Sequence, residues 1–311
     1  MVKPMTNLSP ITLFVYNRPW HTQRTIEALR ANELAGQSDL IIFADGAKSE
    51  KDLPQVEAVR NYIKTISGFK SVKIHEKAQN CGLANSIIAG VTQVVNNYGS
   101  IIVLEDDMVT SQYFLRYMND ALEMYKNEEK VISIHGYTLP VKEELPQTFF
   151  LYGADCWGWA TWKRGWNLFE HDGRNLLKKI DLLSSRHQFD MDGHFPYRKM
   201  LKDQIAGKIS SWAIRWYASA FLEKKLTLYF GKSLIKNIGC DNSGEHCSSR
   251  SKHLGNAELC DRKTEIKKIS AQVNIKIYEL MSKAKGKLKI PLWLRSVQKI
   301  KLIIKNYISH K

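Results

Sequence analysis

The chain has 311 residues, of which 44% are hydrophobic and 25% are charged, a composition typical of a soluble globular protein. Its formal net charge of +15 would suit a nucleic-acid binder, but this charge is concentrated at one end. Residues 262–311 hold 14 Lys and Arg against two Glu, a net of +12, which leaves only +3 for residues 1–261. The nearly neutral body argues against nucleic acid as a partner.

Cysteine use and hydropathy indicate the compartment. The five cysteines form no CxxC pair and are too few for a disulfide scaffold, so we expect reduced thiols in the cytosol. The apolar run near the N-terminus is too short for a signal peptide or a membrane-spanning helix, and no later stretch reaches that length. These features predict a cytoplasmic protein.

The first 135 residues alternate between strand and helix patterns. Strands are expected at residues 11–16, 39–45, 71–77, 100–107 and 131–136, and helices at residues 21–32, 53–66, 83–98 and 113–127. In the helix at 83–98, one face is expected to be apolar; it comprises Leu83, Ile87, Val91, Val94, Val95 and Tyr98. The alternation predicts an α/β fold with a mainly parallel sheet and helices on both of its faces.

The pattern changes near residue 149. FFLYGADCWGWATWKRGW is rich in aromatic residues and glycine, and six of the eight tryptophans lie between Trp157 and Trp216. Helices are expected at 175–187, 195–205 and 210–225, followed by a strand at 226–230. We expect one domain at 1–261, with halves of about 1–135 and 136–261, and a basic helical tail at 262–311.

Polar residues follow four of the predicted strands. Ligands bind beyond the carboxyl ends of the strands in open parallel sheets, so these residues are candidates for a binding site. They are Tyr16, Asn17, Arg18, Asp45, Asn80, Glu105, Asp106 and Asp107. Turn formation and helix capping are an alternative for Asn80, but they do not account for three adjacent carboxylates.

The three carboxylates of IIVLEDD repel one another and resist burial, so they require compensation. A divalent cation is the simplest candidate, because Mg²⁺ or Mn²⁺ is often held by one or two carboxylates together with substrate phosphates. An acidic N-terminus for the following helix is the competing explanation. The sequence has no GxGxxG after the first strand and no P-loop, which disfavours those nucleotide sites.

YNRP, FADG, NCGLANSI and above all EDD, in this order and at strand ends, resemble the GT-A nucleotide-sugar glycosyltransferases. The similarity is to N-acetylglucosaminyltransferase I and to related bacterial enzymes of polysaccharide synthesis, including lipopolysaccharide, and it covers about residues 10–250. It implies a GT-A, Rossmann-like fold, a nucleotide-sugar donor and Mn²⁺ or Mg²⁺.

The resemblance also implies roles for matching residues. EDD resembles the family's DXD-type motif, which makes Asp107 the expected metal ligand. Glu105 and Asp106 are then expected to orient the ribose and the diphosphate, or to support the metal ligand without touching the metal. Asp45 resembles the acid that binds the nucleotide base. Tyr16 and Arg18 resemble residues that flank the base and the diphosphate, and Asn17 and Asn80 join them at the donor site. His246 in GCDNSGEHC is the candidate second metal ligand, although a lone histidine is often a surface residue.

The catalytic base does not match the family pattern. In the N-acetylglucosaminyltransferase I pattern an acid stands beside a tryptophan, whereas this chain has SSWAIRW there. Asp203 and Asp155 are the substitutes to test, since an acceptor hydroxyl must lose its proton. Trp157 and Trp159 are the candidates for lining an acceptor cleft, because indole rings stack on sugars, although most tryptophans are core residues.

In the tail, Trp293, Val297, Ile300, Ile304 and Tyr307 form an apolar stripe with basic residues beside it. Such a helix suits an anionic membrane surface, or packs on the body with a solvated basic face. A lipid-linked acceptor would explain a peripheral position on the cytosolic face of the membrane.

The sequence therefore predicts a metal-dependent glycosyltransferase that moves a sugar, hexosyl or N-acetylhexosaminyl, from a UDP-sugar or similar donor. The acceptor is a glycan or a lipid-linked saccharide. One alternative is a nucleotidyltransferase acting on a sugar phosphate, for which YNRPWHTQR lacks the expected glycine-rich loop. The other is a non-catalytic module that binds nucleic acid or membrane through the tail.

Overall fold

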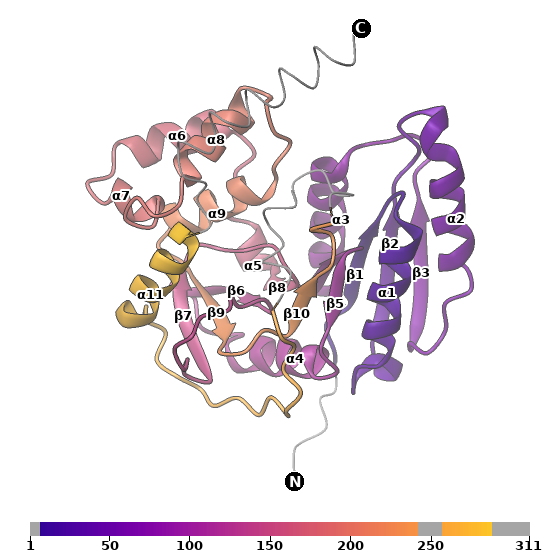
Figure 1. The fold of residues 1–311 in the computed structure, drawn as a ribbon, viewed down its shortest axis with the longest axis horizontal. Coiled ribbons are helices and arrows are strands. Elements are labelled where there is room, and N and C mark those ends of the chain that lie inside the picture. The colour runs from indigo at the N-terminus through magenta and orange to yellow at the C-terminus, as the bar shows by residue number, and fades with distance from the viewer. Residues whose placement is uncertain (1–6, 242–256, 288–311) are drawn as a thin grey trace, which may run out of the picture.

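The computed structural model describes residues 7–241 and 257–287 of the chain (Figure 1). Its centre is an eight-stranded sheet in the order β3-β2-β1-β4-β8-β6-β9-β7, accompanied by a two-stranded sheet, β10-β5. Helices lie on both faces of the large sheet, and a separate group of helices covers one end of it (Figure 1). The predicted α/β fold with a mainly parallel, helix-flanked sheet is confirmed.

The elements of the first half are β1 (Ile11–Val15), α1 (Pro19–Arg30), β2 (Asp39–Ala44), α2 (Leu53–Ile63), β3 (Ser71–Glu76), α3 (Leu83–Tyr98), β4 (Ser100–Glu105), β5 (Met108–Thr110), α4 (Phe114–Met124) and β6 (Val131–His135). Those of the second half are β7 (Thr148–Tyr152), β8 (Trp159–Trp162), α5 (Lys163–Trp166), α6 (Gly173–Asp181), α7 (Arg186–Phe189), α8 (Tyr197–Ile205), α9 (Ala213–Leu222), β9 (Leu226–Phe230), β10 (Ile235–Asn237) and α11 (Ile275–Lys287).

The parallel part of the sheet comprises β3, β2, β1 and β4. Strands β1, β2 and β4 are apolar runs with both faces covered, as parallel strands between two helix layers usually are. Neighbouring side chains point to opposite faces: Leu13 packs in the cluster that contains Ile26 of α1, whereas Phe14 packs in the cluster of α3. This arrangement brings the ends of β1, β2, β3 and β4 to one edge.

The second half of the sheet contains a strand that the sequence did not predict. β8 pairs antiparallel with both β4 and β6, and Trp159 stands opposite Val103 on one side and His135 on the other. Two antiparallel pairings in succession make β6 run in the same direction as β4. The carboxyl end of β6 therefore lies at the same edge as Glu105.

Two core predictions need correction or refinement. Along α3, Ile87, Val91, Val94 and Val95 are buried as expected. Tyr98, the last residue of the helix, is 42% exposed and contacts Lys73 of the edge strand β3. The tryptophans of the second half are mostly core residues: Trp159, Trp166, Trp212 and Trp216 stack in one cluster on the α3 side of the sheet, and Trp162 is also buried.

Residues 257–287, which include the first part of the predicted tail, pack along the body. The Cys260 amide donates to the Ser233 carbonyl at 2.8 Å, and Val273 forms an isolated bridge with Phe150. On α11, Ile277 and Met281 are buried in the main core cluster. The apolar stripe from Trp293 to Tyr307 lies outside the described residues. No helix in the described ranges is long and apolar enough to cross a membrane.

Candidate functional site

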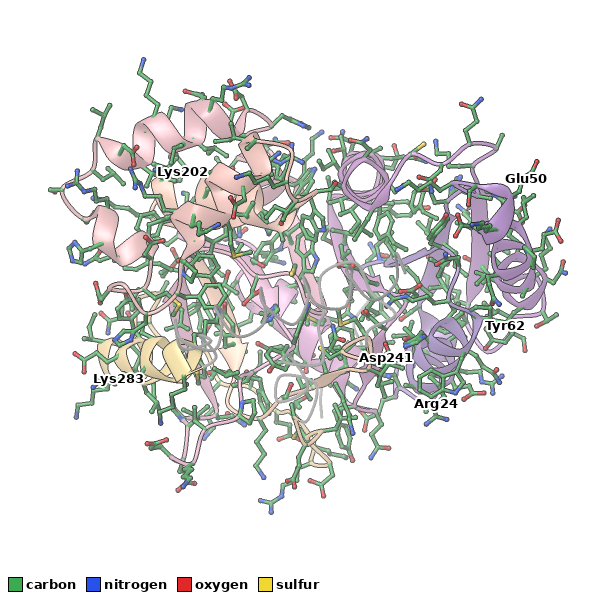
Figure 2. The ribbon with its side chains drawn as sticks, turned by 45° about the horizontal axis from the view of Figure 1, so that its top comes forward. Arg24, Glu50, Tyr62, Lys202, Asp241 and Lys283 are labelled. Carbon is green, nitrogen blue, oxygen red and sulfur yellow. The ribbon has the colours of Figure 1, made fainter. Side chains whose placement is uncertain are left out.

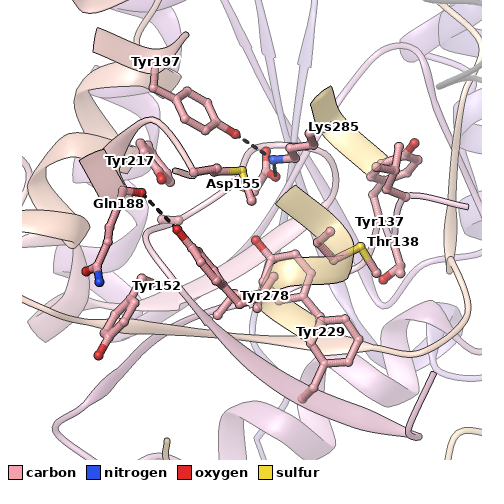
Figure 3. Close-up of a pocket in the computed structure, with 16 residues that line it drawn as sticks. Tyr137, Thr138, Tyr152, Asp155, Gln188, Tyr197, Tyr217, Tyr229, Tyr278 and Lys285 are labelled. Atoms are coloured by element: carbon pink, nitrogen blue, oxygen red, sulfur yellow. Dashed lines mark hydrogen bonds and ion pairs between the residues drawn. The ribbon is translucent and has the colours of Figure 1, made fainter. Parts of the chain in front are cut away.

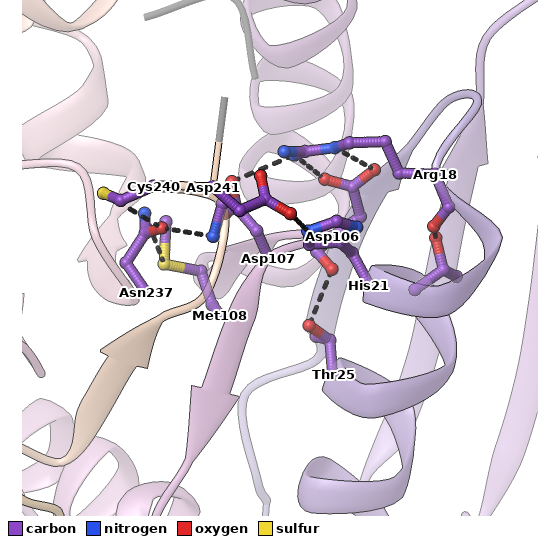
Figure 4. Close-up of polar contacts among 11 residues, drawn as sticks. Arg18, His21, Thr25, Asp106, Asp107, Met108, Asn237, Cys240 and Asp241 are labelled. Atoms are coloured by element: carbon purple, nitrogen blue, oxygen red, sulfur yellow. Dashed lines mark hydrogen bonds and ion pairs between the residues drawn. The ribbon is translucent and has the colours of Figure 1, made fainter. Parts of the chain in front are cut away.

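Three carboxylates, Glu105, Asp106 and Asp107, which we call the strand-end carboxylates, lie where β4 turns into β5. Figure 4 shows Asp106 and Asp107. Neighbouring elements fix this turn: Thr25 of α1 donates from Oγ1 to the Asp106 carbonyl at 2.7 Å, and the Ile238 amide donates to the Asp107 carbonyl at 2.9 Å. The residues Asp106 and Asp107 are 4% and 7% exposed. Burial of adjacent acids without compensation would be strongly unfavourable.

Arg18 provides part of the compensation. It ends the β1–α1 turn, and its guanidinium binds both oxygens of Asp106 as well as Asp107 Oδ2, the last at 3.0 Å. Burial alone would lower the pKa of Arg18, but the charges of Asp106 and Asp107 raise it above its usual value, so the guanidinium stays charged. Arg18 was predicted from the sequence as a diphosphate neighbour, but this direct ion pair was not predicted.

One cation does not balance three acids, and the proton distribution reflects this. Burial, followed by the charges of Asp107 and Asp106, raises the pKa of Glu105 to about 8. Burial also raises the pKa of Asp106, against the opposing effect of Arg18. Near neutral pH Glu105 is therefore mostly protonated. Arg18 still faces two carboxyl groups, those of Asp106 and Asp107.

Two buried polar atoms of this cluster have no hydrogen-bond partner among the described residues: Arg18 Nη1 and Asp107 Oδ1. Gly239, two residues after β10, packs directly over them, and a Cβ at this position would collide with Asp107 Oδ2 and lie 2.9 Å from Arg18 Nη1. Buried polar atoms are almost always paired in folded proteins. The cluster thus has one spare acceptor and one spare donor group beside a backbone that approaches closely.

The residues after Gly239 extend the site. Asp241 Oδ2 lies 3.0 Å from His21 Nε2 of α1 (Figure 4). Asp241 is near the middle of the molecule in Figure 2. His246, in the same loop, was predicted from the sequence as a metal ligand, but it lies outside the described residues. Asp241 was missed, and its place in GCDNSGEHC, close after a strand, was the only signal that could have indicated it.

Asp45 has a mainly structural set of contacts. Its carboxylate accepts hydrogen bonds from the backbone amides of Gly46, Cys81 and Gly82, and from the Asn80 side chain, at 2.9–3.1 Å. These donors hold the loop after β3 and the start of α3, where a negative charge is also favoured by the helix dipole. Asp45 and Asn80 thus lie together as predicted, with their polar atoms directed to one another.

Tyr16 and Asn17 lie at the same edge, after β1. The Tyr16 hydroxyl accepts a hydrogen bond from the Lys48 amide at 2.9 Å, and the Asn17 side chain donates to Asp52 Oδ1 at 3.0 Å. Both contacts tie the end of β1 to the segment after β2. The structure therefore brings the predicted donor-side residues to one edge of the sheet.

The predicted acceptor-side residues are separated. Trp159 is fully buried in β8, stacked 5.4 Å from Trp212, so the prediction that it lines a cleft is wrong: its ring fills the space between the sheet and α9. Trp157 is half-buried and packs edge-on against Tyr137 at 4.8 Å. Asp203 lies on α8 in an ion pair with Lys199, and its neighbour Lys202 marks this outer helix in Figure 2.

Asp155 lies in a pocket lined by aromatic residues between β7, β9, α8, α9 and α11, which we call the tyrosine pocket (Figure 3). Its Oδ2 is 3.5 Å from Lys285 Nζ and 4.0 Å from His135 Nε2. Burial would raise the pKa of Asp155, but Lys285 and then His135 lower it below its usual value. Lys285 was missed because it lies in the segment expected to be a basic tail.

A divalent metal is the group that the resemblance implies. Among the described residues no three His, Cys, Asp or Glu side chains converge as a metal-binding group. The unpaired Asp107 Oδ1 nevertheless suits a hard cation, and a site of one or two carboxylates completed by substrate phosphates is usual for Mg²⁺. The residues present therefore fit a metal that shares its coordination with a bound diphosphate, with Asp107 as its protein ligand.

The sequence matches no family model and no curated protein sequence. Among solved structures, TarS of S. aureus has a TM-score of 0.40 and 13% identity over 81% of this chain, which spans 41% of the TarS chain. Mannosyltransferase PcManGT of Pyrobaculum calidifontis, solved with GDP-Man and Mn²⁺, has a TM-score of 0.37 and 9% identity over 70% of both chains.

A UDP-glucose pyrophosphorylase complexed with UDP-glucose has a TM-score of 0.36 and 11% identity, over 72% of this chain and 90% of its own. The solved structures similar to this chain thus include a mannosyltransferase and a UDP-glucose pyrophosphorylase. At such scores and identities, none of these likenesses assigns an activity to the chain.

Proposed function

We propose that this protein is a metal-dependent GT-A glycosyltransferase that moves a sugar from a nucleoside diphosphate donor, UDP-linked in the first instance, to a glycan or lipid-linked saccharide. The observation that carries the proposal is the pair of buried, unpartnered atoms at the strand-end carboxylates, Asp107 Oδ1 and Arg18 Nη1. An acceptor for a cation stands beside a donor for an anion, which is the combination that a metal-bound diphosphate requires.

The donor would lie along the edge formed by the ends of β1, β2 and β4. Arg18 and Asp107 face the diphosphate, and Tyr16 and Asn17 flank the nucleoside. Asp45 shapes the base side by holding Asn80, Cys81 and Gly82, since its carboxylate oxygens are already engaged. Gly239 closes the site from above because only a residue without a Cβ fits against Asp107.

In the transfer, a bond forms between the acceptor oxygen and the anomeric carbon while the bond from that carbon to the diphosphate oxygen breaks. A bound Mn²⁺ or Mg²⁺ would supply charge neutralisation for the departing nucleoside diphosphate. Arg18 adds a fixed positive charge on the same side. The proton of the acceptor hydroxyl passes to a carboxylate. We assign this role to Asp155 because it lines the tyrosine pocket and its side chain is 31% exposed there.

Asp203 is the less favourable candidate for the base. Its carboxylate is paired with Lys199 one helical turn earlier on α8, away from the strand-end carboxylates. Asp203 is ion-paired on the outer helix α8, and no contact among the described residues connects it to the donor site. Asp203→Asn thus provides a comparison for Asp155→Asn in any activity assay.

The membrane part of the proposal concerns the C-terminal segment. A lipid-linked acceptor would place the enzyme on the cytosolic face of a membrane, with residues 288–311 as the contact. Sedimentation with vesicles that contain anionic lipid, compared with neutral vesicles, tests this part independently of catalysis.

The central test is a thermal-shift panel of UDP, GDP and CDP, each with and without Mn²⁺, on the wild type, Asp107→Asn and the control Glu57→Gln, an exposed acid on α2. We expect stabilisation by one nucleotide with Mn²⁺, its loss in Asp107→Asn and its retention in Glu57→Gln. If no nucleoside diphosphate stabilises the wild type, the proposal fails. Release of pyrophosphate from a nucleoside triphosphate and a sugar phosphate would instead identify a nucleotidyltransferase.

A further inference from the structure

The tyrosine pocket opens to solvent and is lined mainly by aromatic and apolar side chains, with a few polar groups among them. Small-molecule sites usually have such a lining. Six tyrosines line it: Tyr137, Tyr152, Tyr197, Tyr217, Tyr229 and Tyr278. Aromatic rings with polar edges are the side chains that bind sugar rings through their faces and hydroxyl groups through their edges.

Two charged side chains face each other in this pocket (Figure 3). Lys285 Nζ donates to the Tyr197 hydroxyl at 2.6 Å and lies 3.5 Å from Asp155 Oδ2. Nearby, His135 is fully buried, and burial lowers its pKa to about 4, so it is neutral at physiological pH. One positive and one negative charge cancel, so the pocket offers no net attraction for an anion or a cation.

The pocket also contains polar side-chain groups that can still form hydrogen bonds with a ligand. The side chains of Asp155 and Lys285 are 31% and 24% exposed, so each keeps surface open to the cavity. The hydroxyls of Tyr217 and Tyr278 donate to backbone carbonyls, whereas no hydrogen bond joins the Tyr152 or Tyr229 hydroxyl to another described residue. Donors and acceptors are therefore both available beside the aromatic faces, as recognition of a polyol requires.

The pocket adjoins the strand-end carboxylates. His135 and Val103 both pair with Trp159, so the ends of β6 and β4 lie at one level of the sheet. Tyr137, two residues beyond β6, is close enough to Asp155 and Lys285 on one side and to Cys240 on the other for each of them to affect its pKa. Cys240 directly follows Gly239, which packs on Asp107.

We infer that the tyrosine pocket binds an uncharged sugar ring, oriented by Asp155 and Lys285, and that α11 is therefore part of the binding site. The net-neutral ion pair, the six tyrosines and the free hydroxyls favour a neutral saccharide over a charged one. That this sugar is the acceptor of the transfer rests on the proposed glycosyltransferase function, whereas the binding itself does not.

The test measures binding of simple methyl glycosides to the full chain by saturation-transfer NMR. The neutral probes are the methyl glycosides of glucose, galactose, mannose and N-acetylglucosamine, and the charged probes are methyl glucuronide and glucosamine. We expect at least one neutral probe to saturate with a Kd on the order of 1 mM and the charged probes to bind at least about tenfold more weakly. Binding of the anionic or cationic probe in preference, or of none, would overturn the inference.

Variants locate the binding. Lys285→Met should weaken the neutral probe at least about tenfold, because the orienting cation is lost and Asp155 is left unpaired. Lys283→Met is the matched control: it lies on the same helix but is exposed, and Figure 2 shows it at the outer side of α11. Tyr229→Phe removes one hydroxyl without disturbing the ion pair and should weaken binding about two- to tenfold. If Tyr229→Phe and Lys285→Met both bind the glycoside as tightly as the wild type does, the assignment is refuted.

The same samples separate this inference from the proposed function. A thermal shift with UDP and Mn²⁺ reports on the strand-end carboxylates, and glycoside binding reports on the tyrosine pocket. Glycoside binding without any nucleotide response would contradict the glycosyltransferase proposal and support the saccharide-binding pocket. A nucleotide response without glycoside binding would support the glycosyltransferase proposal and contradict the saccharide-binding pocket.

Discussion

The strand-end carboxylates and the tyrosine pocket lie at the same edge of one sheet, but they balance charge differently. In the first region Arg18 faces two aspartates, and the pKa of Glu105 is raised to about 8. In the second, Lys285 faces Asp155 alone. The first region has more carboxyl groups than cations and an unpaired carboxylate oxygen, whereas the second pairs one cation with one anion and keeps hydrogen-bonding groups.

This difference teaches how one sheet can serve two kinds of ligand. Under the proposed function, the surplus of carboxyl groups is compensated by a bound cation, which in turn attracts a diphosphate. A matched ion pair among tyrosines attracts neither charge and instead selects shape and hydrogen bonding. The parallel half supplies the first environment, and the helices packed on the second half, including α11, supply the second.

The largest expected effect comes from removing the spare oxygen of the first region. Asp107→Asn keeps the shape and the contact of one side-chain atom with Arg18, but it removes the negative charge that a metal needs. Transfer or donor hydrolysis should fall about 10³-fold, the size seen when a charge-stabilising group is lost from an active site. Steady-state assays at several Mn²⁺ concentrations measure this. Unchanged Mn²⁺ dependence in Asp107→Asn would show that the metal binds elsewhere.

The next prediction tests the neutrality of the second region. Burial lowers the pKa of His135 to about 4 from an ordinary 6.5, so the unfolded chain binds the extra proton between these values and the folded chain does not. The free energy of unfolding should therefore rise with pH from about 4 to about 6.5, with His135 contributing about 3 kcal/mol.

His135→Phe should lack this contribution. Urea unfolding at a series of pH values gives the difference between wild type and variant, which should change through this window and be constant above it. A difference that does not vary with pH would mean that the pKa of His135 is the same in the folded and the unfolded chain. The pocket would then gain a positive charge as the pH falls through about 6.5 and would not stay neutral.

Sequence reasoning succeeded where structure is local. The helices and strands of the first half follow from hydrophobic periodicity. Tyr16, Asp45 and Glu105 lie at one edge of the sheet because parallel strands end there together. β8 was missed because CWGWATW has no clear period. Its strand exists because Trp159 has partners on both β4 and β6.

The missed site residues depend on tertiary docking. Arg18 and Asp106 are 88 positions apart, so their ion pair follows from the order of the strands and not from any motif. Lys285 appears in the sequence as one of many basic residues after residue 261. Its role depends on how α11 packs, with Ile277 and Met281 in the core, and this packing has no local signature. Long-range pairing of this kind sets the limit of what one sequence predicts.

A smaller effect is expected at Asp45, and it sharpens the account of the donor side. Asp45→Asn leaves one oxygen as an acceptor but removes the charge that holds the amides of Cys81 and Gly82. The free energy of unfolding should fall by about 2 kcal/mol, since hydrogen bonds to charged groups contribute about 1.5–3 kcal/mol each. Urea unfolding tests this, with Glu57→Gln unchanged. A variant of full stability that no longer binds nucleotide would make Asp45 a direct reader of the base.

The smallest predicted effect concerns the backbone that covers the first region. Gly239→Ala places a methyl group against Asp107 Oδ2 and Arg18 Nη1, so the loop must move away from the carboxylate. Asp107 then loses its close cover, and we expect the apparent affinity for Mn²⁺ with UDP to weaken about tenfold, or about 1.4 kcal/mol. The matched control is Gly36→Ala, where the nearest atom to a new Cβ, Gly68 O, is 4.0 Å away. Mn²⁺ titrations followed by thermal shift measure both variants.

The tyrosine pocket provides the contrast, since glycoside binding should be the same in Gly239→Ala as in the wild type. A loss of both activities would mean that the two regions are one continuous site whose covering loop serves both ligands.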